Sequence, residues 1–204
     1  MKGLAGFQLQ TIRSVHPKNA GKIFQTLLAI TFCRLDFRVK NHLSQGVDID
    51  IWNHPSLSNF SIEVKSTTTD TVWLYPKDFQ DWEKKLAEGY KIAFAVLRLD
   101  VTADWAIAPA QRIRAGKNFV LIMQSFAIRE LQTAVTEEYP NVVATYAEEI
   151  YLQPSSQVLT YLAHCLEKEQ KKRRKLKNIQ MKRLVSRAES SCCSDISSIQ
   201  TSRC

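Results

Sequence analysis

The chain has 204 residues, of which 45% are hydrophobic and 24% are charged, and its formal net charge is +8. This length suits one folded domain with an appendage, and no apolar run reaches the roughly 18 residues needed to cross a bilayer. The first ten residues lack the apolar stretch of a secretory signal. We therefore expect no membrane partner and a cytoplasmic protein, or a nuclear one in a eukaryotic cell.

The five cysteines match neither a redox pair nor a zinc-binding set. Their number is odd, and three of them lie in the Ser-rich C-terminal segment. These features argue against a disulfide framework and favour a reducing compartment. Cys33 falls on an apolar helical pattern, where we expect a buried, inert thiol.

The positive charge is concentrated at the C-terminal end of the chain. Residues 167–204 carry 11 Lys and Arg against 4 Asp and Glu, whereas residues 1–166 carry 17 against 16. We predict a folded domain over residues 1–166, a basic helical extension over 167–189 and a disordered Ser/Cys-rich tail over 190–204. A basic block of this kind favours an arm that binds a polyanion.

The hydrophobic pattern predicts an α/β domain. Apolar residues at helical spacing predict a helix over roughly residues 18–34, and a short strand near residues 37–39 follows. Period-2 alternation predicts two adjacent strands over 47–52 and 60–67. The later elements expected are a strand over 71–75, a helix over 76–89, a buried strand over 91–99, a strand over 105–108, a helix over about 118–138 and a last helix from about residue 155 into the basic segment.

Polar residues alternate with apolar ones on the two adjacent strands. Glu63 and Lys65 share one face of their strand, and Asp48 and Asp50 share one face of the neighbouring strand. Because the apolar residues should meet the core, the carboxylates and the lysine gather on the other side. One or two carboxylates, with water and a substrate phosphate, satisfy Mg²⁺. Such an ion activates a bound water, and a nearby Lys orients that water or stabilises negative charge.

The segments GVDID and IEVKST resemble the PD-(D/E)xK nuclease superfamily, and their order is most similar to its Holliday-junction-resolvase-like and restriction-endonuclease-like branches. The resemblance covers roughly residues 17–110. It implies a central mixed β-sheet flanked by helices, with an αβββαβ core. It also implies hydrolysis of DNA phosphodiester bonds with Mg²⁺, for which Mn²⁺ can substitute. Many members of the family pair to cut two strands, so a homodimer is one arrangement that it suggests.

The resemblance also implies roles for individual residues. Asp48, Glu63 and Lys65 would be the catalytic residues. Asp48, Glu63 and the main-chain carbonyl of Val64 would hold the metal. The proline that precedes the first acid in much of the family is replaced here by Val47.

Three further residues are candidates for supporting roles. Asp50 is an alternative metal ligand or a residue that supports the ligands. Gln25 stands where many relatives carry a Glu on the first helix, and its amide oxygen could hold a metal-bound water without supplying charge. Ser66 follows the lysine and could bond a phosphate at the edge of the site.

The basic extension supplies the candidate nucleic-acid-binding residues, which are Lys171, Lys172, Arg173, Arg174 and Lys175. A solvated helix surface, or a nuclear-import signal, would have the same composition. Two other interpretations of the whole chain stay open. One is a catalytically inactive nuclease-fold module that binds nucleic acid or a protein partner, and the other is an α/β domain whose acidic pattern is accidental. DNA and RNA are not distinguished.

Overall fold

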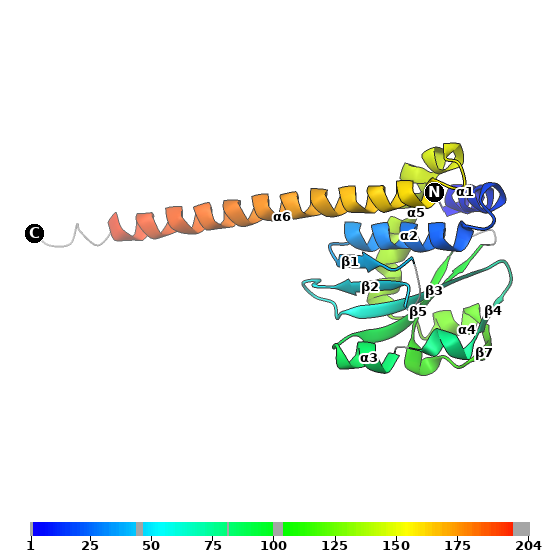
Figure 1. The fold of residues 1–204 in the computed structure, drawn as a ribbon. Helices are drawn as coiled ribbons and strands as arrows, with labels where there is room; N and C mark the ends of the chain where they lie inside the picture. Colours follow the sequence, from blue (N-terminus) through cyan, green and yellow to red (C-terminus); the bar gives the residue numbers. More distant parts are fainter. Residues whose placement is uncertain (1, 44–46, 81, 100–103, 198–204) are drawn as a thin grey trace, which may run out of the picture.

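A computed structural model describes residues 2–43, 47–80, 82–99 and 104–197, with side-chain surroundings described as far as residue 180 (Figure 1). A mixed five-stranded sheet lies at its centre, in the order β1-β2-β3-β5-β6. β3 and β5 are parallel, and the other neighbours are antiparallel. The strands of this sheet are β1 (Arg38–Asn41), β2 (Ile49–Trp52), β3 (Phe60–Thr67), β5 (Lys91–Arg98) and β6 (Trp105–Pro109).

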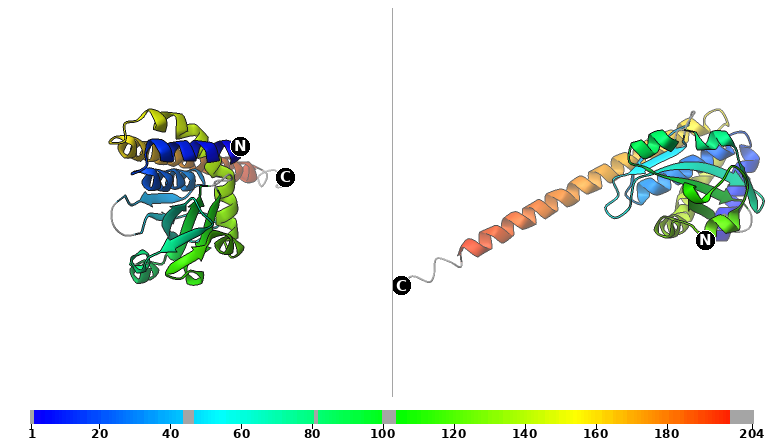
Figure 2. Two further views of the ribbon diagram at one scale, coloured as in Figure 1. Left: turned by 90° about the vertical axis from the view of Figure 1, so that its right-hand side faces the viewer. Right: turned by 90° about the horizontal axis from the view of Figure 1, so that it is seen from below.

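Helices cover both faces of the sheet (Figures 1 and 2). One face carries α1 (Lys2–Val15), α2 (Ala20–Arg34), α5 (Arg129–Leu152) and α6 (Val158–Ser197), and α6 extends away from the domain in Figure 1. The other face carries α3 (Trp82–Ala87), α4 (Val120–Ser125) and a two-stranded sheet of β4 (Thr71–Leu74) and β7 (Gly116–Phe119). Two short 3₁₀ helices are η1 (Pro76–Phe79) and η2 (Ala110–Arg112). Within the described residues, no helix has both the length and the apolar character to cross a membrane.

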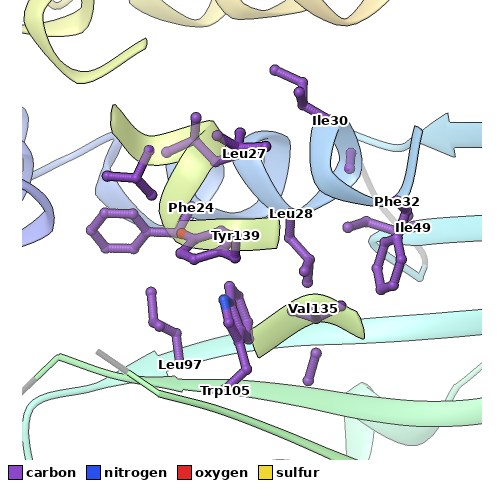
Figure 3. Packing of buried hydrophobic residues seen from close by; sticks show 14 of the residues in the cluster. Phe24, Leu27, Leu28, Ile30, Phe32, Ile49, Leu97, Trp105, Val135 and Tyr139 are labelled. Atoms are coloured by element: carbon purple, nitrogen blue, oxygen red, sulfur yellow. The ribbon is translucent and has the colours of Figure 1, made fainter. Parts of the chain in front are cut away.

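Two hydrophobic clusters hold these layers together. The larger cluster lies between the sheet and the long helices, and Phe24, Trp105 and Tyr139 are among its largest buried side chains (Figure 3). The smaller cluster lies under β4, β7 and α4. Leu97 of β5 belongs to the first cluster and Phe94 to the second. The continuous apolar run of β5 follows from burial on both faces.

The predicted fold class is confirmed, since a central mixed sheet flanked by helices is followed by a helical C-terminal part. The helix predicted over 18–34 and the strands predicted over 60–67 and 91–99 are present within a few residues. β2 and β3 are adjacent, as expected, and their antiparallel pairing places Ile49 opposite Ile62.

Two predicted helices are wrong in their extent. The helix expected over 76–89 is divided into η1 and α3, because the chain at Gln80 is extended. The helix expected over 118–138 begins as strand β7, because this segment pairs with β4. The remainder is divided into α4, which ends at Ser125, and α5, which starts at Arg129. The pairing of β7 with β4 is a contact distant in sequence, and it overrides local helix propensity.

The two ends of the chain also differ from expectation. Helix α1 was not predicted, although Ala5, Leu9 and Ile12 have helical spacing and are buried. At the other end, α6 continues through residues 190–197, where disorder was expected. Extending an existing helix costs little compared with starting one. Residues 198–204 of the predicted tail lie outside the described residues.

Candidate active site

A cavity of about 690 Å³ lies where α2, the start of β2, the middle of β3 and η1 meet. It contains the residues predicted to act in catalysis, and Asp50 is not among those that line it. The lining residues are Lys18, Gly21, Lys22, Phe24, Gln25, Asp48, Glu63, Val64, Lys65, Ser66, Lys77, Asp78 and Gln80.

Two buried carboxylates lie side by side in this cavity. Asp48 comes directly before β2, so the antiparallel register places it opposite Glu63 of β3. Each residue is only 7% exposed. The Oδ2 atom of Asp48 accepts a hydrogen bond of 2.9 Å from the main-chain N–H of Val64. This bond fixes the first carboxylate against the strand that carries the second.

Glu63 has a strongly perturbed acidity. Burial raises its pKa, the negative charge of Asp48 raises it further, and the value reaches about 7 although Lys65 opposes the shift. The carboxyl group therefore holds its proton more strongly than an ordinary Glu side chain does. A cation placed between the two acids would favour their charged forms.

Lys65 bridges Glu63 to Asp78, an acid whose role the sequence did not indicate. Its Nζ donates to Glu63 Oε1 at 2.8 Å and to Asp78 Oδ1 at 2.9 Å. Burial lowers the pKa of Lys65, but the two carboxylates more than offset this effect and the pKa lies above its ordinary value. Lys65 is thus held as an ammonium ion at neutral pH.

Asp78 is buried at the third position of η1. Its Oδ2 accepts a hydrogen bond of 2.7 Å from the main-chain N–H of Tyr75, and its Oδ1 faces Lys65. The available sequence signal was an acid three residues after Tyr75 with Pro76 between them, which is typical of a helix start. That signal predicts a capping residue and gives no hint of contact with β3.

Lys22 is the other residue that sequence reasoning missed. From α2, its Nζ donates to Asp48 Oδ1 at 3.0 Å and to Gln25 Oε1 at 2.9 Å. The spacing of three residues places Lys22 and Gln25 on one side of the helix. Lys18 and Lys77 also line the cavity, so four lysines surround three buried acids, and the site favours an anionic ligand.

Gln25 connects α2 to the strands on the other side of the site. Its Nε2 donates to three oxygens, namely Asn41 Oδ1 at 2.7 Å, the His42 carbonyl at 2.8 Å and the Asp48 carbonyl at 3.0 Å. Its Oε1 accepts from Lys22. Both ends of this buried amide are therefore used within the protein, and they hold the main chain of Asp48 in place.

Asp50 is two residues from Asp48 and is therefore expected on the same face of the strand, but its surroundings are different. Its carboxylate lies 3.0 Å from His42 Nε2, 2.7 Å from Ser61 Oγ and 2.8 Å from Lys85 Nζ. Burial raises the pKa of Asp50, but these three partners lower it by more, so the pKa lies below its ordinary value. The structure places Asp50 in a buried polar cluster between β1, β3 and α3.

The basic residues of the extension lie on α6, and none of the five lines the cavity. Arg173 is half-buried, and its Nη1 is 3.2 Å from Asp36 Oδ1. The other four, which are Lys171, Lys172, Arg174 and Lys175, are exposed. The basic run is therefore a surface separate from the acidic site.

The donors in the cavity suit a hard cation that keeps several waters. Among the described residues, no group of three or more His, Cys, Asp or Glu side chains could hold a metal ion. Asp48 and Glu63 supply two carboxylates, and Val64 also lines the cavity. Mg²⁺ needs only one or two carboxylates when substrate and water complete its shell, so these residues fit such an ion.

No protein-family model matches the chain, and no curated protein matches it. A solved structure with some similarity is Hjc, a Holliday junction resolvase from the archaeal hyperthermophile Archaeoglobus fulgidus. The sequences are 18% identical, and the alignment covers 55% of this chain and 95% of Hjc with a TM-score of 0.46. This similarity is too low to support a functional argument, which therefore depends on the geometry of the site.

Proposed function

We propose that this chain is a Mg²⁺-dependent endonuclease that hydrolyses DNA phosphodiester bonds. The observation that carries the proposal is the convergence of two buried carboxylates, Asp48 and Glu63, with the ammonium group of Lys65 in one cavity. The raised pKa of Glu63 supports it further, because strongly perturbed acids in a cleft are typical of functional sites.

In the proposed reaction, Asp48, Glu63 and the carbonyl of Val64 hold the ion. When bound, the ion supplies an acidified water and neutralises charge on the scissile phosphate. Lys65 remains protonated between its two acids, so it donates a hydrogen bond to the attacking water or to a phosphoryl oxygen. Stabilising the developing negative charge in this way lowers the barrier.

Two further residues have supporting roles in this proposal. Asp78 fixes the position of Lys65 through a 2.9 Å bond and is itself fixed by the main chain at Tyr75. Lys22 lies against Asp48 at the other side of the cavity, where it can transfer its hydrogen bond to a substrate phosphate.

One observation favours a second candidate function, a nuclease-fold module that binds nucleic acid without cutting it. Asp48 is already paired with Lys22, and Glu63 with Lys65, at 3.0 Å and 2.8 Å. The acids are therefore neutralised by the chain's own lysines, and a metal ion would have to compete with them. Metal affinity that depends on the carboxylates separates the two functions.

The test is cleavage of a panel of plasmid, four-way junction, flap and single-stranded DNA with Mg²⁺, Mn²⁺ or EDTA. Wild type should cut at least one substrate, and Glu63→Ala and Lys65→Ala should abolish cutting. Glu83→Ala is the matched control, because Glu83 is exposed on α3 and does not line the cavity. Cleavage that survives Glu63→Ala would refute the proposal. Binding without cleavage, and without carboxylate-dependent affinity for Mg²⁺, would favour the inactive module.

A further inference from the structure

One face of the β4–β7 sheet exposes three aromatic rings. Val72 and Leu74 of β4 point into the smaller hydrophobic cluster, so strand alternation turns Trp73 and Tyr75 outward. Trp73 is 57% exposed and Tyr75 is 53% exposed. Phe119 of β7, opposite Thr71 in the register, is 49% exposed. Large aromatic rings with this exposure, gathered on one small sheet, are typical of a binding surface.

Two lysines accompany these rings. Lys117 lies opposite Trp73 in the register, and its Nζ is 5.5 Å from the ring centre of Phe119. The Nζ of Lys77 is 5.6 Å from the ring centre of Tyr75. Neither lysine forms an ion pair within the described residues. We call Trp73, Tyr75 and Phe119, with Lys77 and Lys117, the aromatic face.

β7 itself carries no acid, and Asp70, which directly precedes β4, is paired with Arg98 at 3.1 Å. The sequence from residue 105 to residue 129 contains four basic residues and no acidic one. A surface of flat rings with unpaired cations is complementary to planar bases joined by phosphates. Two copies of the face in a symmetric dimer would instead bring like charges together.

The aromatic face is continuous with the candidate active site. Lys77 lines the cavity that contains Asp48 and Glu63, and it also lies over Tyr75. β4 follows β3 after only three residues, and β3 carries Glu63 and Lys65. A strand whose phosphates enter the cavity can therefore place its neighbouring bases on the rings.

We propose that the aromatic face binds the unpaired bases of a nucleic-acid strand that runs into the cavity. In this arrangement, which rests in part on the proposed function, the substrate is single-stranded or has an unpaired segment beside the scissile phosphate. Trp73 and Tyr75 are two residues apart on an extended chain, hence about 7 Å apart. This separation is close to two base-stacking steps of about 3.4 Å. A duplex hides the faces of its bases, so the aromatic face selects against fully paired substrates.

The test measures binding of the full chain in EDTA, where no cleavage is needed. Fluorescence anisotropy compares a labelled single-stranded oligonucleotide, a duplex of the same length and a strand with an abasic stretch. Trp73→Ala should weaken binding to the single strand about tenfold, because stacking contributes roughly 1–3 kcal/mol per base, and should change binding to the duplex and the abasic strand less than about twofold. Trp73→Phe should restore most of the loss. Phe7→Ala on α1 is the control, since Phe7 is 67% exposed in the other layer.

Several outcomes overturn the inference. Unchanged single-strand affinity in Trp73→Ala, with native circular dichroism, would show that the ring does not bind bases. An equal loss for the single strand and the abasic strand would exclude stacking. A concentration-dependent dimer that Trp73→Ala abolishes, without a change in single-strand affinity, would make the surface a subunit interface. A base-dependent loss in a protein that cuts no DNA would support the aromatic face and refute the nuclease. Parallel oligoribonucleotides identify the nucleic acid that it prefers.

Discussion

Replacing Gln25 by Glu should destabilise the fold, even though Glu is the residue that the family resemblance suggests at this position. The Nε2 of Gln25 donates to three oxygens, of Asn41, His42 and Asp48. A carboxylate in the same place has no hydrogen to donate. It would leave the acceptors of Asn41 and His42 without this donor, whereas the Asp48 carbonyl keeps the main-chain N–H of His42 at 2.8 Å. It would also add a negative charge beside these oxygens.

The size of the effect follows from these contacts. Each buried acceptor left without a donor costs about 1–3 kcal/mol, and Asn41 is only half-buried, so water compensates part of its loss. The new charge would gain from Lys22, but the Lys22 side chain is 36% exposed, which limits the gain to about 1 kcal/mol. We expect Gln25→Glu to lower the free energy of unfolding by about 3 kcal/mol at pH 7.

Urea denaturation followed by circular dichroism measures this loss. Gln80→Glu is the matched control, because Gln80 lines the same cavity but is exposed, and it should change stability by less than about 0.5 kcal/mol. When the introduced carboxyl group is protonated it regains a donor, so the folded state raises its pKa. The penalty is complete above this raised folded pKa, shrinks as the pH falls from there towards the unfolded pKa of about 4.3, and is smallest below it. A Gln25→Glu protein as stable as wild type at pH 7 would refute the assigned hydrogen bonds.

Three other predictions test groups outside the cavity. Asp50→Asn should lower the free energy of unfolding by about 3 kcal/mol at pH 7, because it breaks a buried ion pair with Lys85, and it should leave Mg²⁺-dependent cleavage intact. Burial raises the pKa of Asp50, but its partners lower it by more, so the folded pKa lies below the unfolded one. The stability that the Asp50 carboxylate contributes is therefore present above the unfolded pKa and is lost as the pH falls through the folded pKa. Wild type and Asp50→Asn should therefore converge in urea titrations below about pH 4, and a constant difference would contradict this. Changing the four exposed basic residues at positions 171, 172, 174 and 175 to Gln should reduce the salt slope of DNA binding by about 3, whereas an unchanged slope would assign them to a solvated surface. Burial raises the pKa of Cys33 to about 11, so iodoacetamide at pH 8 should label Cys33 only after unfolding, as peptide mass spectrometry would show.

Strand periodicity explains why much of the fold was predictable. The alternation in Phe60–Thr67 places Ile62 in the core and Glu63 on the opposite side of the strand, and the structure has this arrangement. β5 was predicted from its apolar run, because a strand buried on both faces needs no polar side. These signals are local, so a single sequence contains them. Strand β7 was missed because it forms by pairing with β4, about 45 residues earlier in the chain.

The parts of the site that were missed depend on tertiary packing. Lys22 lies on a helix and Asp78 in a short turn, 26 and 15 positions from Asp48 and Glu63 in the chain. Their contacts with the acids exist only because α2 and η1 pack at opposite sides of the same strands. A sequence pattern predicts which face of a strand a residue occupies, but it does not predict which distant side chain meets that face.

Asp48 and Asp50 show how much the alternation of side chains along a strand can predict about a site. Alternation assigns both acids to the same face of the strand. Asp50 nevertheless has three polar partners in a buried cluster, whereas Asp48 lies in the cavity with Lys22 and the N–H of Val64. An acid with all its acceptors occupied by rigid neighbours is a poor metal ligand, because binding would leave those neighbours unpaired. Lys22 is on the cavity wall and can turn to a phosphate instead. Under the proposed function, an arriving nucleic-acid strand would therefore release Asp48 for the ion, and each ligand would strengthen the binding of the other.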